Sequence, residues 1–367
     1  MSLIDLPQTK WGGGTGRQVI LKGDFAKIEQ AVTEAFEFTR GPGLEYVDSA
    51  TLRVNATADC KARVMMCGFP SPLARGHWVD GGLSDGRYRE NAAPVSLNLA
   101  TVAHLWGAEK PDQWYAVYAL AGATDAIFSL KAMPVIRVAS QDGQVVTLRN
   151  NANGANIGYG FTVNELAEAG LLILSGASRG LLRAITANNA DNGTGGTITY
   201  GGAALTLAQG DWGLVLPATN FRYLGMGFND ASGNLAPFYQ EAGLTTYRSP
   251  RQLCSGAING YTLMDLGLVA PPTAYRLEGY AAAAAGYDVK LAVSYDGSTP
   301  ALVVHGSPPA ADFQGERGAI PYRPMIGTIG TAPEEEAVSS YLPGPHGGNM
   351  DIAYCQDWRW VAGTVGG

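Results

Sequence analysis

The segment 176–180, Gly-Ala-Ser-Arg-Gly, has the residue types of a nucleophilic serine turn. In α/β hydrolases two glycines allow a sharp turn that exposes the serine hydroxyl, and a histidine accepts its proton. An apolar run, 171–174, precedes the turn, and Asp288 and His305 lie downstream as partners for Ser178. However, the chain does not alternate helices with strands, as a parallel sheet requires. We therefore predict a plain turn rather than an active site, and no enzyme.

The residues that most often bind metals are scattered. No two of the four histidines have ligand spacing; they are His77, His104, His305 and His346. The four cysteines include no CxxC pair and are too few and too dispersed for a disulfide framework; they are Cys60, Cys67, Cys254 and Cys355. We predict buried free thiols, no metal site and no cofactor.

Two further segments suggest chemistry that their surroundings do not support. Residues 11–16, Trp-Gly-Gly-Gly-Thr-Gly, lack the preceding strand and the lysine of a phosphate-binding loop. They suit a flexible arm whose Trp11 inserts into a pocket of a neighbouring subunit, since buried tryptophans are common interface anchors. The acidic run 334–336 follows Pro333 and is typical of a solvated loop, whereas glycosidases need two carboxylates about 5–10 Å apart.

Trp358 and Trp360 alternate onto one face of a predicted strand near the end of the chain. If that face is exposed, the two rings could stack on a glycan. If it is buried, they complete the core of a β-sandwich. The residue pattern leaves both alternatives open.

Composition favours an all-β protein that assembles with copies of itself. The chain has 49 glycines and 20 prolines without a Gly-X-Y period, so it must make many turns between short elements. Only 16% of residues are charged, against about 25% in ordinary soluble domains, and charge depletion is typical of interface cores. A large monomer with Thr- and Asn-coated sheets is the alternative.

The charge pattern and the termini exclude several partners. The net charge is −7 and the basic residues do not cluster, so a nucleic-acid partner is not expected. No apolar run approaches the roughly 20 residues that span a bilayer. Because residues 1–14 lack a secretory signal pattern, we expect folding in a bacterial cytoplasm.

The elements fall into three predicted regions. Residues 1–43 form an arm and a short helix, in which Asp24 caps the start and an apolar stripe faces a partner; the stripe is Phe25, Ile28, Val32 and Ala35. This helix either bundles with symmetry mates or packs on its own β domain. Residues 44–250 form a β domain with an inserted lobe at about 138–215, and 251–367 form a C-terminal β-sandwich. Within the lobe, 163–169 could form a short helix.

Several strands stand out within this scheme. Residues 113–122 alternate around a Trp-Tyr-Ala-Val-Tyr core, and 221–240 suit two strands around a turn. A later segment, 269–279, reads Val-Ala-Pro-Pro-Thr-Ala-Tyr-Arg-Leu-Glu-Gly.

Together, residues 112–133 and 216–240 resemble tail-fibre and related virion proteins of bacteriophages. The features that match are the aromatic strand at 114–118, the Phe-Arg-Tyr-Leu-Gly strand at 221–225, and the Gly-Asn turn leading to Pro-Phe-Tyr at 233–239. Segment 269–279 resembles the linker into the next β domain of such fibres. One departure is the long stretch between the two halves, where a short connection is expected.

The resemblance implies a homotrimeric virion appendage that folds in the host cytoplasm, binds other virion proteins and contacts a host surface glycan or receptor. It brings no catalytic residues. A capsid decoration or head-fibre protein would show a similar composition and strand pattern and is the first alternative. A serine or glycan hydrolase of the particle is the alternative from another functional class.

Overall fold

The structure is a computed structural model that describes residues 42–57, 61–66, 68–70, 78–79, 88–122, 127–149, 158–191, 196–241 and 244–248, followed by shorter segments. Those segments are 251–252, 261–263, 271–273, 276–283, 288–293, 300–305, 314–321, 338–341 and 350–355. Across these residues the chain is built from antiparallel strands, with one 3-10 turn, η2 (Val102–His104), and no α-helix. The prediction of a mainly β protein is confirmed. The helix expected in 24–40 lies outside the described residues.

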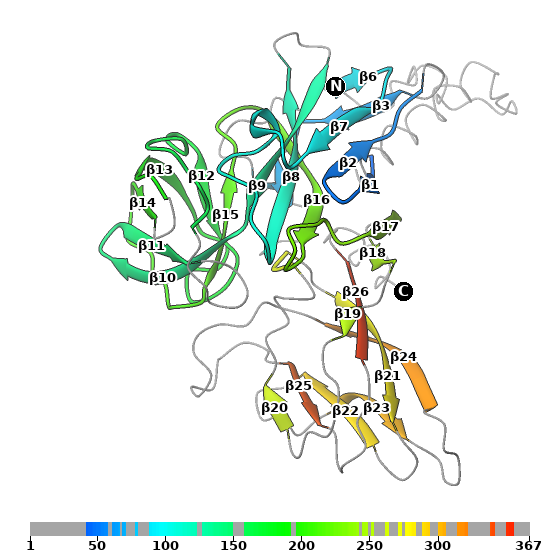
Figure 1. The fold of residues 1–367 in the computed structure, drawn as a ribbon. Helices are drawn as coiled ribbons and strands as arrows, with labels where there is room; N and C mark the ends of the chain where they lie inside the picture. The colour runs from blue at the N-terminus through cyan, green and yellow to red at the C-terminus, as the bar shows by residue number, and fades with distance from the viewer. Residues whose placement is uncertain are drawn as a thin grey trace, which may run out of the picture.

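A three-stranded sheet and two strand pairs form the N-terminal part (Figure 1). The sheet has the order β1 (Leu44–Asp48), β2 (Thr51–Val54), β7 (Val95–Asn98). The pairs are β3 (Ala62–Met65) with β6 (Tyr88–Asn91), and β4 (Phe69–Pro70) with β5 (Trp78–Val79).

The central sheet joins the two segments on which the resemblance rests. Its order is β16 (Phe221–Asn229), β8 (Gln113–Ala121), β9 (Phe128–Pro134). Seven of the nine residues of β8 and eight of the nine of β16 are buried, which explains their near-continuous apolar and aromatic composition. Other segments cover both outer strands: Trp106 N–H bonds the carbonyl of Ala132 on β9, and Gly68 N–H bonds that of Phe221 on β16. These contacts occupy part of the outer edge of each strand, which hinders pairing with a further strand there.

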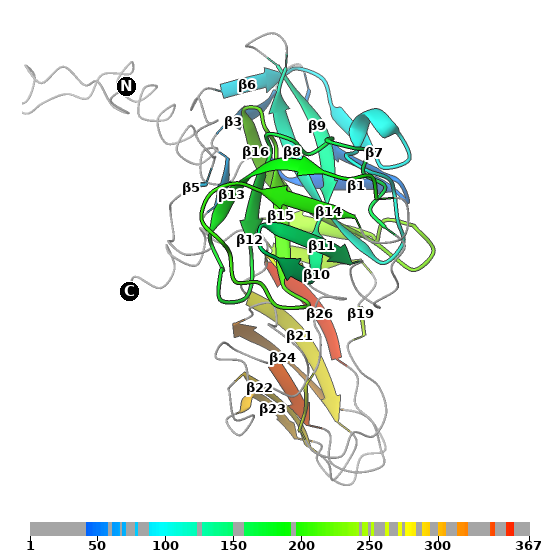
Figure 2. The same cartoon turned by 90° about the vertical axis from the view of Figure 1, so that its left-hand side faces the viewer.

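A closed six-stranded barrel lies between β9 and β16 in the chain. Around the barrel the order is β10 (Ile136–Asp142), β11 (Val145–Arg149), β14 (Thr197–Tyr200), β13 (Leu182–Asn188), β12 (Gly170–Ile173), β15 (Trp212–Leu216). It occupies almost the same residues as the inserted lobe expected at 138–215. Figure 1 shows the barrel to one side of the central sheet, and Figure 2 shows it in front of that sheet. Closure leaves the barrel without an open sheet edge.

The topology explains why the two halves of the resemblance are far apart in the chain. Both β9 and β16 run antiparallel to β8, so they run parallel to each other with β8 between them. β9 ends opposite Tyr115, whereas β16 begins opposite Leu120. Parallel strands need a crossover of about a dozen residues or more. The long stretch between the two halves of the resemblance is therefore the crossover between two parallel strands, and the barrel forms it.

Two sheets make up the C-terminal part and contact each other through β21 and β24 of the first and β22 and β23 of the second. The first has the order β17 (Phe238–Glu241), β18 (Leu244–Tyr247), β26 (Met350–Cys355), β21 (Arg276–Ala283), β24 (Gln314–Pro321), with β19 (Arg251–Gln252) also paired to β26. The second has the order β20 (Tyr261–Leu263), β25 (Val338–Tyr341), β22 (Asp288–Val293), β23 (Pro300–His305). The first sheet thus takes strands from both sides of the boundary expected at 250.

Residues 163–168 form turns and not the short helix suggested at 163–169. Asn164 and Glu168 have positive φ values of 58° and 71°, which interrupt a right-handed helix. Asn188 on β13 holds the segment, since its Oδ1 accepts the Leu166 N–H at 2.8 Å and its carbonyl accepts the Asn164 N–H at 2.9 Å. Tertiary hydrogen bonds therefore override the local helix propensity.

Candidate functional site

The glycine-flanked serine lies in the turn between β12 and β13 of the barrel. Gly176 and Gly180 have φ values of 77° and 80°, so the glycines do provide the sharp turn that the motif indicates. Ser178, however, is only 3% exposed, and its Oγ accepts the Thr206 N–H at 2.7 Å. The hydroxyl therefore faces a neighbouring loop of the barrel and not solvent.

A buried carboxylate holds the same turn. Asp211, with no exposed surface, accepts the Ser175 hydroxyl at 3.0 Å through Oδ1 and the Ala208 N–H at 2.7 Å through Oδ2. Ser175 Oγ in turn accepts the Trp212 N–H at 2.8 Å. Burial raises the pKa of Asp211 above its ordinary value, and the bonds from Ala208 and Ser175 oppose that rise.

The packing around Asp211 also explains why a glycine is needed at 176. A Cβ at that position would lie 2.4 Å from Asp211 Oδ2. The first glycine of the motif therefore makes room for a carboxylate that ties the turn to β15. Sequence reasoning missed Ser175 and Asp211, because they are far apart in the chain and neither belongs to a recognisable motif.

A catalytic triad is not assembled from the residues singled out in the sequence. Asp288 and His305 are cross-strand partners in β22 and β23, which belong to a different sheet from Ser178. His104 Nδ1 accepts the Asn98 N–H at 3.0 Å beside β7. His77 and His346 lie outside the described residues. The position of Ser178 agrees with a structural turn.

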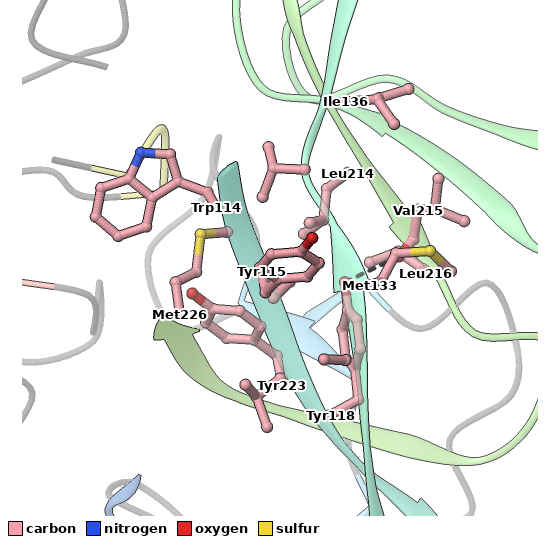
Figure 3. Packing of buried hydrophobic residues seen from close by; sticks show 14 of the residues in the cluster. Trp114, Tyr115, Tyr118, Met133, Ile136, Leu214, Val215, Leu216, Tyr223 and Met226 are labelled. Atoms are coloured by element: carbon pink, nitrogen blue, oxygen red, sulfur yellow. Dashed lines mark hydrogen bonds between the residues drawn. The ribbon is translucent and has the colours of Figure 1, made fainter. Parts of the chain in front are cut away.

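The two segments of the resemblance meet in an aromatic seam between β8 and β16. Trp114 pairs with Phe228 across the strands, and their ring centroids are 4.9 Å apart. Tyr118 contacts Phe221 edge-on at 5.5 Å. Figure 3 shows side chains of β8, β9 and β16 packed beside those of β15. This seam is the common core of the central sheet and the barrel.

Polar contacts fix the barrel to the central sheet. A single buried residue, Val135, connects β9 to β10. Tyr118 donates its hydroxyl to the Val215 carbonyl at 2.9 Å (Figure 3). On the loop before β8, the Gly107 N–H bonds Glu165 Oε1 at 2.9 Å. The barrel therefore contacts the rest of the chain at several points in addition to its covalent connection through Val135.

Among the described residues, seven large apolar side chains are exposed. They are Val47, Val102, Ile127, Val145, Val163, Leu181 and Tyr239. Tyr239 is 61% exposed, and the Arg248 guanidinium lies 4.5 Å from its ring centroid and 5.1 Å from that of Tyr46. Exposed apolar side chains are common on protein surfaces and do not by themselves mark a binding face.

The residues predicted to make subunit or glycan contacts lie outside the described part of the chain. The subunit-contact set is Trp11, Phe25, Ile28, Val32 and Ala35, and the glycan-contact set is Trp358 and Trp360. Both sets stay predictions. Within the described ranges no group of three or more His, Cys, Asp or Glu side chains could hold a metal ion. No helix there has the length and apolar character needed to cross a membrane.

Comparison with known proteins gives no match: no family model, no curated protein and no solved structure is similar to this chain.

Proposed function

We propose that this chain is a structural subunit of a bacteriophage particle, a tail-fibre-like appendage that works as a homotrimer. Residues 1–43 attach to the particle and to sister subunits, and the β domains extend outward toward the host surface. In this role Trp11 and the apolar stripe of 24–40 mediate assembly. Trp358 and Trp360 contact a surface glycan.

The observation that carries this proposal is the pairing of β8 with β16. The two segments that resemble tail-fibre proteins are distant in the chain, yet their strands β8 and β16 pair along nearly their full length. If the two matches were unrelated, there would be no reason for the two segments to form one sheet. The barrel as crossover accounts for the departure from the expected layout.

The shared core and the sheet edges of the described part support a structural role. Central sheet and barrel share one buried core, from Leu52 and Val54 in β2 through Trp114 to Leu214 in β15. Outer strands β9 and β16 are covered by loops, and the barrel has no open edge. Sheets whose edges are contacted or closed resist uncontrolled strand pairing, which suits an appendage that must persist outside the cell.

The mass of the purified full-length chain tests the assembly. Native mass spectrometry is expected to show a species of three 38.5 kDa chains that persists on dilution. The double variant Ile28→Asp/Val32→Asp places charges on the predicted stripe and is expected to give monomers. The matched control Val102→Asp, on an 81% exposed side chain, is expected to leave the trimer intact. A wild-type chain that stays monomeric at high concentration would contradict the proposal.

A further inference from the structure

Two amide side chains face each other at the end of the aromatic seam. Gln113 is the first residue of β8, Asn229 is the last of β16, and the two are opposite in register. On the other side of β8 the Trp114 carbonyl accepts the Val135 N–H at 2.9 Å, so the backbone of Trp114 faces β9 and that of Gln113 faces β16. Gln113 and Asn229 are therefore a hydrogen-bonded type of antiparallel pair, with Cα atoms about 5.5 Å apart and side chains on the same face of the sheet. Neither has any exposed surface.

The nitrogen of each amide is fully used, which fixes the direction of both groups. Gln113 Nε2 donates to the carbonyls of Val135 at 2.7 Å and Trp114 at 3.1 Å. Asn229 Nδ2 donates to Glu109 Oε1 at 3.1 Å and to the Lys110 carbonyl at 3.2 Å. Turning either amide over would place its oxygen against two acceptors. The orientation of the two groups is thus set by their surroundings.

Both amide oxygens are left without a donor from the protein. Gln113 Oε1 and Asn229 Oδ1 are buried and accept no hydrogen bond. An unsatisfied buried acceptor is costly, and two at facing positions indicate one shared partner that donates twice. We propose that Gln113 and Asn229 bind a single buried water molecule, which bridges β8 and β16 beside the residue where the barrel leaves the sheet.

Charge decides between water and a metal ion. A water has two O–H donors for the two neutral oxygens. Ca²⁺ takes six to eight oxygen ligands, and burying an ion without compensating charge is costly. Glu109 is the carboxylate that contacts this pair, and its Oε1 already accepts from Asn229. A neutral water molecule therefore fits the site better than a metal ion does.

The site has a mechanical consequence. The Val135 carbonyl accepts from Gln113, and Val135 alone joins β9 to β10. The water thereby links β16, through Gln113, to the residue that connects the central sheet to the barrel. This inference does not depend on the proposed function.

Crystals of the full-length chain at high resolution test the site directly. One density peak is expected at hydrogen-bond distance, about 2.7–3.0 Å, from both oxygens. No peak, two separate peaks, or a peak about 2.3–2.6 Å from several oxygens, the geometry of Ca²⁺, would overturn the proposal.

Water-17O magnetic relaxation dispersion tests it in solution by counting long-lived internal waters. The double variant Gln113→Met/Asn229→Leu is expected to lose one such water. The matched control Gln141→Met removes a glutamine whose amide already bonds Tyr200 and Leu207, and it should keep the wild-type count. An equal count in the wild type and the double variant, with both folded by circular dichroism, would count against the bridging water.

Discussion

Replacement of Gly176 by alanine should destabilise the barrel strongly, because two separate costs add at this position. At a φ of 77° an L-residue costs about 1–2 kcal/mol. The new Cβ would also lie 2.4 Å from Asp211 Oδ2, 2.5 Å from its Oδ1 and 2.7 Å from its Cγ. Asp211 is buried and bonded on both oxygens, so it cannot move freely away. Overpacking of this kind costs about 1–3 kcal/mol, which gives a total of about 2–5 kcal/mol.

Two other glycines separate the backbone cost from the steric cost. Gly233 has the same φ of 77°, and Gly143, at the barrel turn between β10 and β11, has a φ of 57°. A Cβ at either position meets nothing within 4 Å. Their alanine variants should therefore pay only the backbone cost of about 1–2 kcal/mol.

Native-state hydrogen exchange, followed by mass spectrometry, gives the opening free energy of the strands near each site. Gly176→Ala should lower it for β12 and β15 by more than Gly143→Ala lowers it for β10 and β11. If the two losses agree within about 0.5 kcal/mol, Gly176 is not there to accommodate Asp211. In that case the structural account of the Gly-x-Ser-x-Gly turn fails.

Three further substitutions test neighbouring parts of the account. Ser178→Ala should lower barrel stability by about 0.5–1.5 kcal/mol, because the Thr206 N–H loses its acceptor. The variant should hydrolyse p-nitrophenyl acetate at the wild-type rate. A large fall in that rate would restore the hydrolase alternative. Asp211→Asn should flatten the pH dependence of thermal unfolding. Because folding raises the pKa of Asp211, the wild-type protein loses stability as pH rises from the ordinary pKa of 3.8 through the folded value, and the variant lacks this loss. Parallel profiles of stability against pH for the two proteins would refute the assignment. Tyr118→Phe leaves the Val215 carbonyl without its donor and should lower the opening free energy of β15 by about 1–3 kcal/mol in hydrogen exchange, whereas unchanged protection would show that this bond does not hold the barrel.

Residue alternation predicted the strands well where both faces of a strand are buried. The aromatic run at 113–122 corresponds to β8, and the apolar run around 221–229 corresponds to β16. In these segments burial requirements and local pattern agree, so the pattern is informative.

Sequence patterns failed where distant groups decide the structure. The turns at 163–168 depend on Asn188, which no local pattern connects to them. The segment 221–240 was expected to be two strands around one turn, and the turn at 230–234 is present. β17 nevertheless pairs with β18 and not with β16, because the chain leaves the central sheet after the Asn229–Leu235 bridge.

The candidate site was only partly accessible from sequence for the same reason. Glycines 176 and 180 indicated a sharp turn, but the direction in which the turn faces depends on Asp211 and Thr206 in later loops. Barrel closure depends on the pairing of β10 with β15, whose residues are distant in the chain. Such pairings follow from packing in three dimensions and have no local signature.

Cryo-electron microscopy of intact phage particles, with this chain located by a bound antibody fragment, tests the proposed role most directly. We expect density for three copies at the distal part of the tail, with residues 1–43 toward the particle. The barrels should lie beside the central sheets as they do within one chain. Particles that lack the chain, or a chain recovered only as a free monomer outside them, would contradict the account.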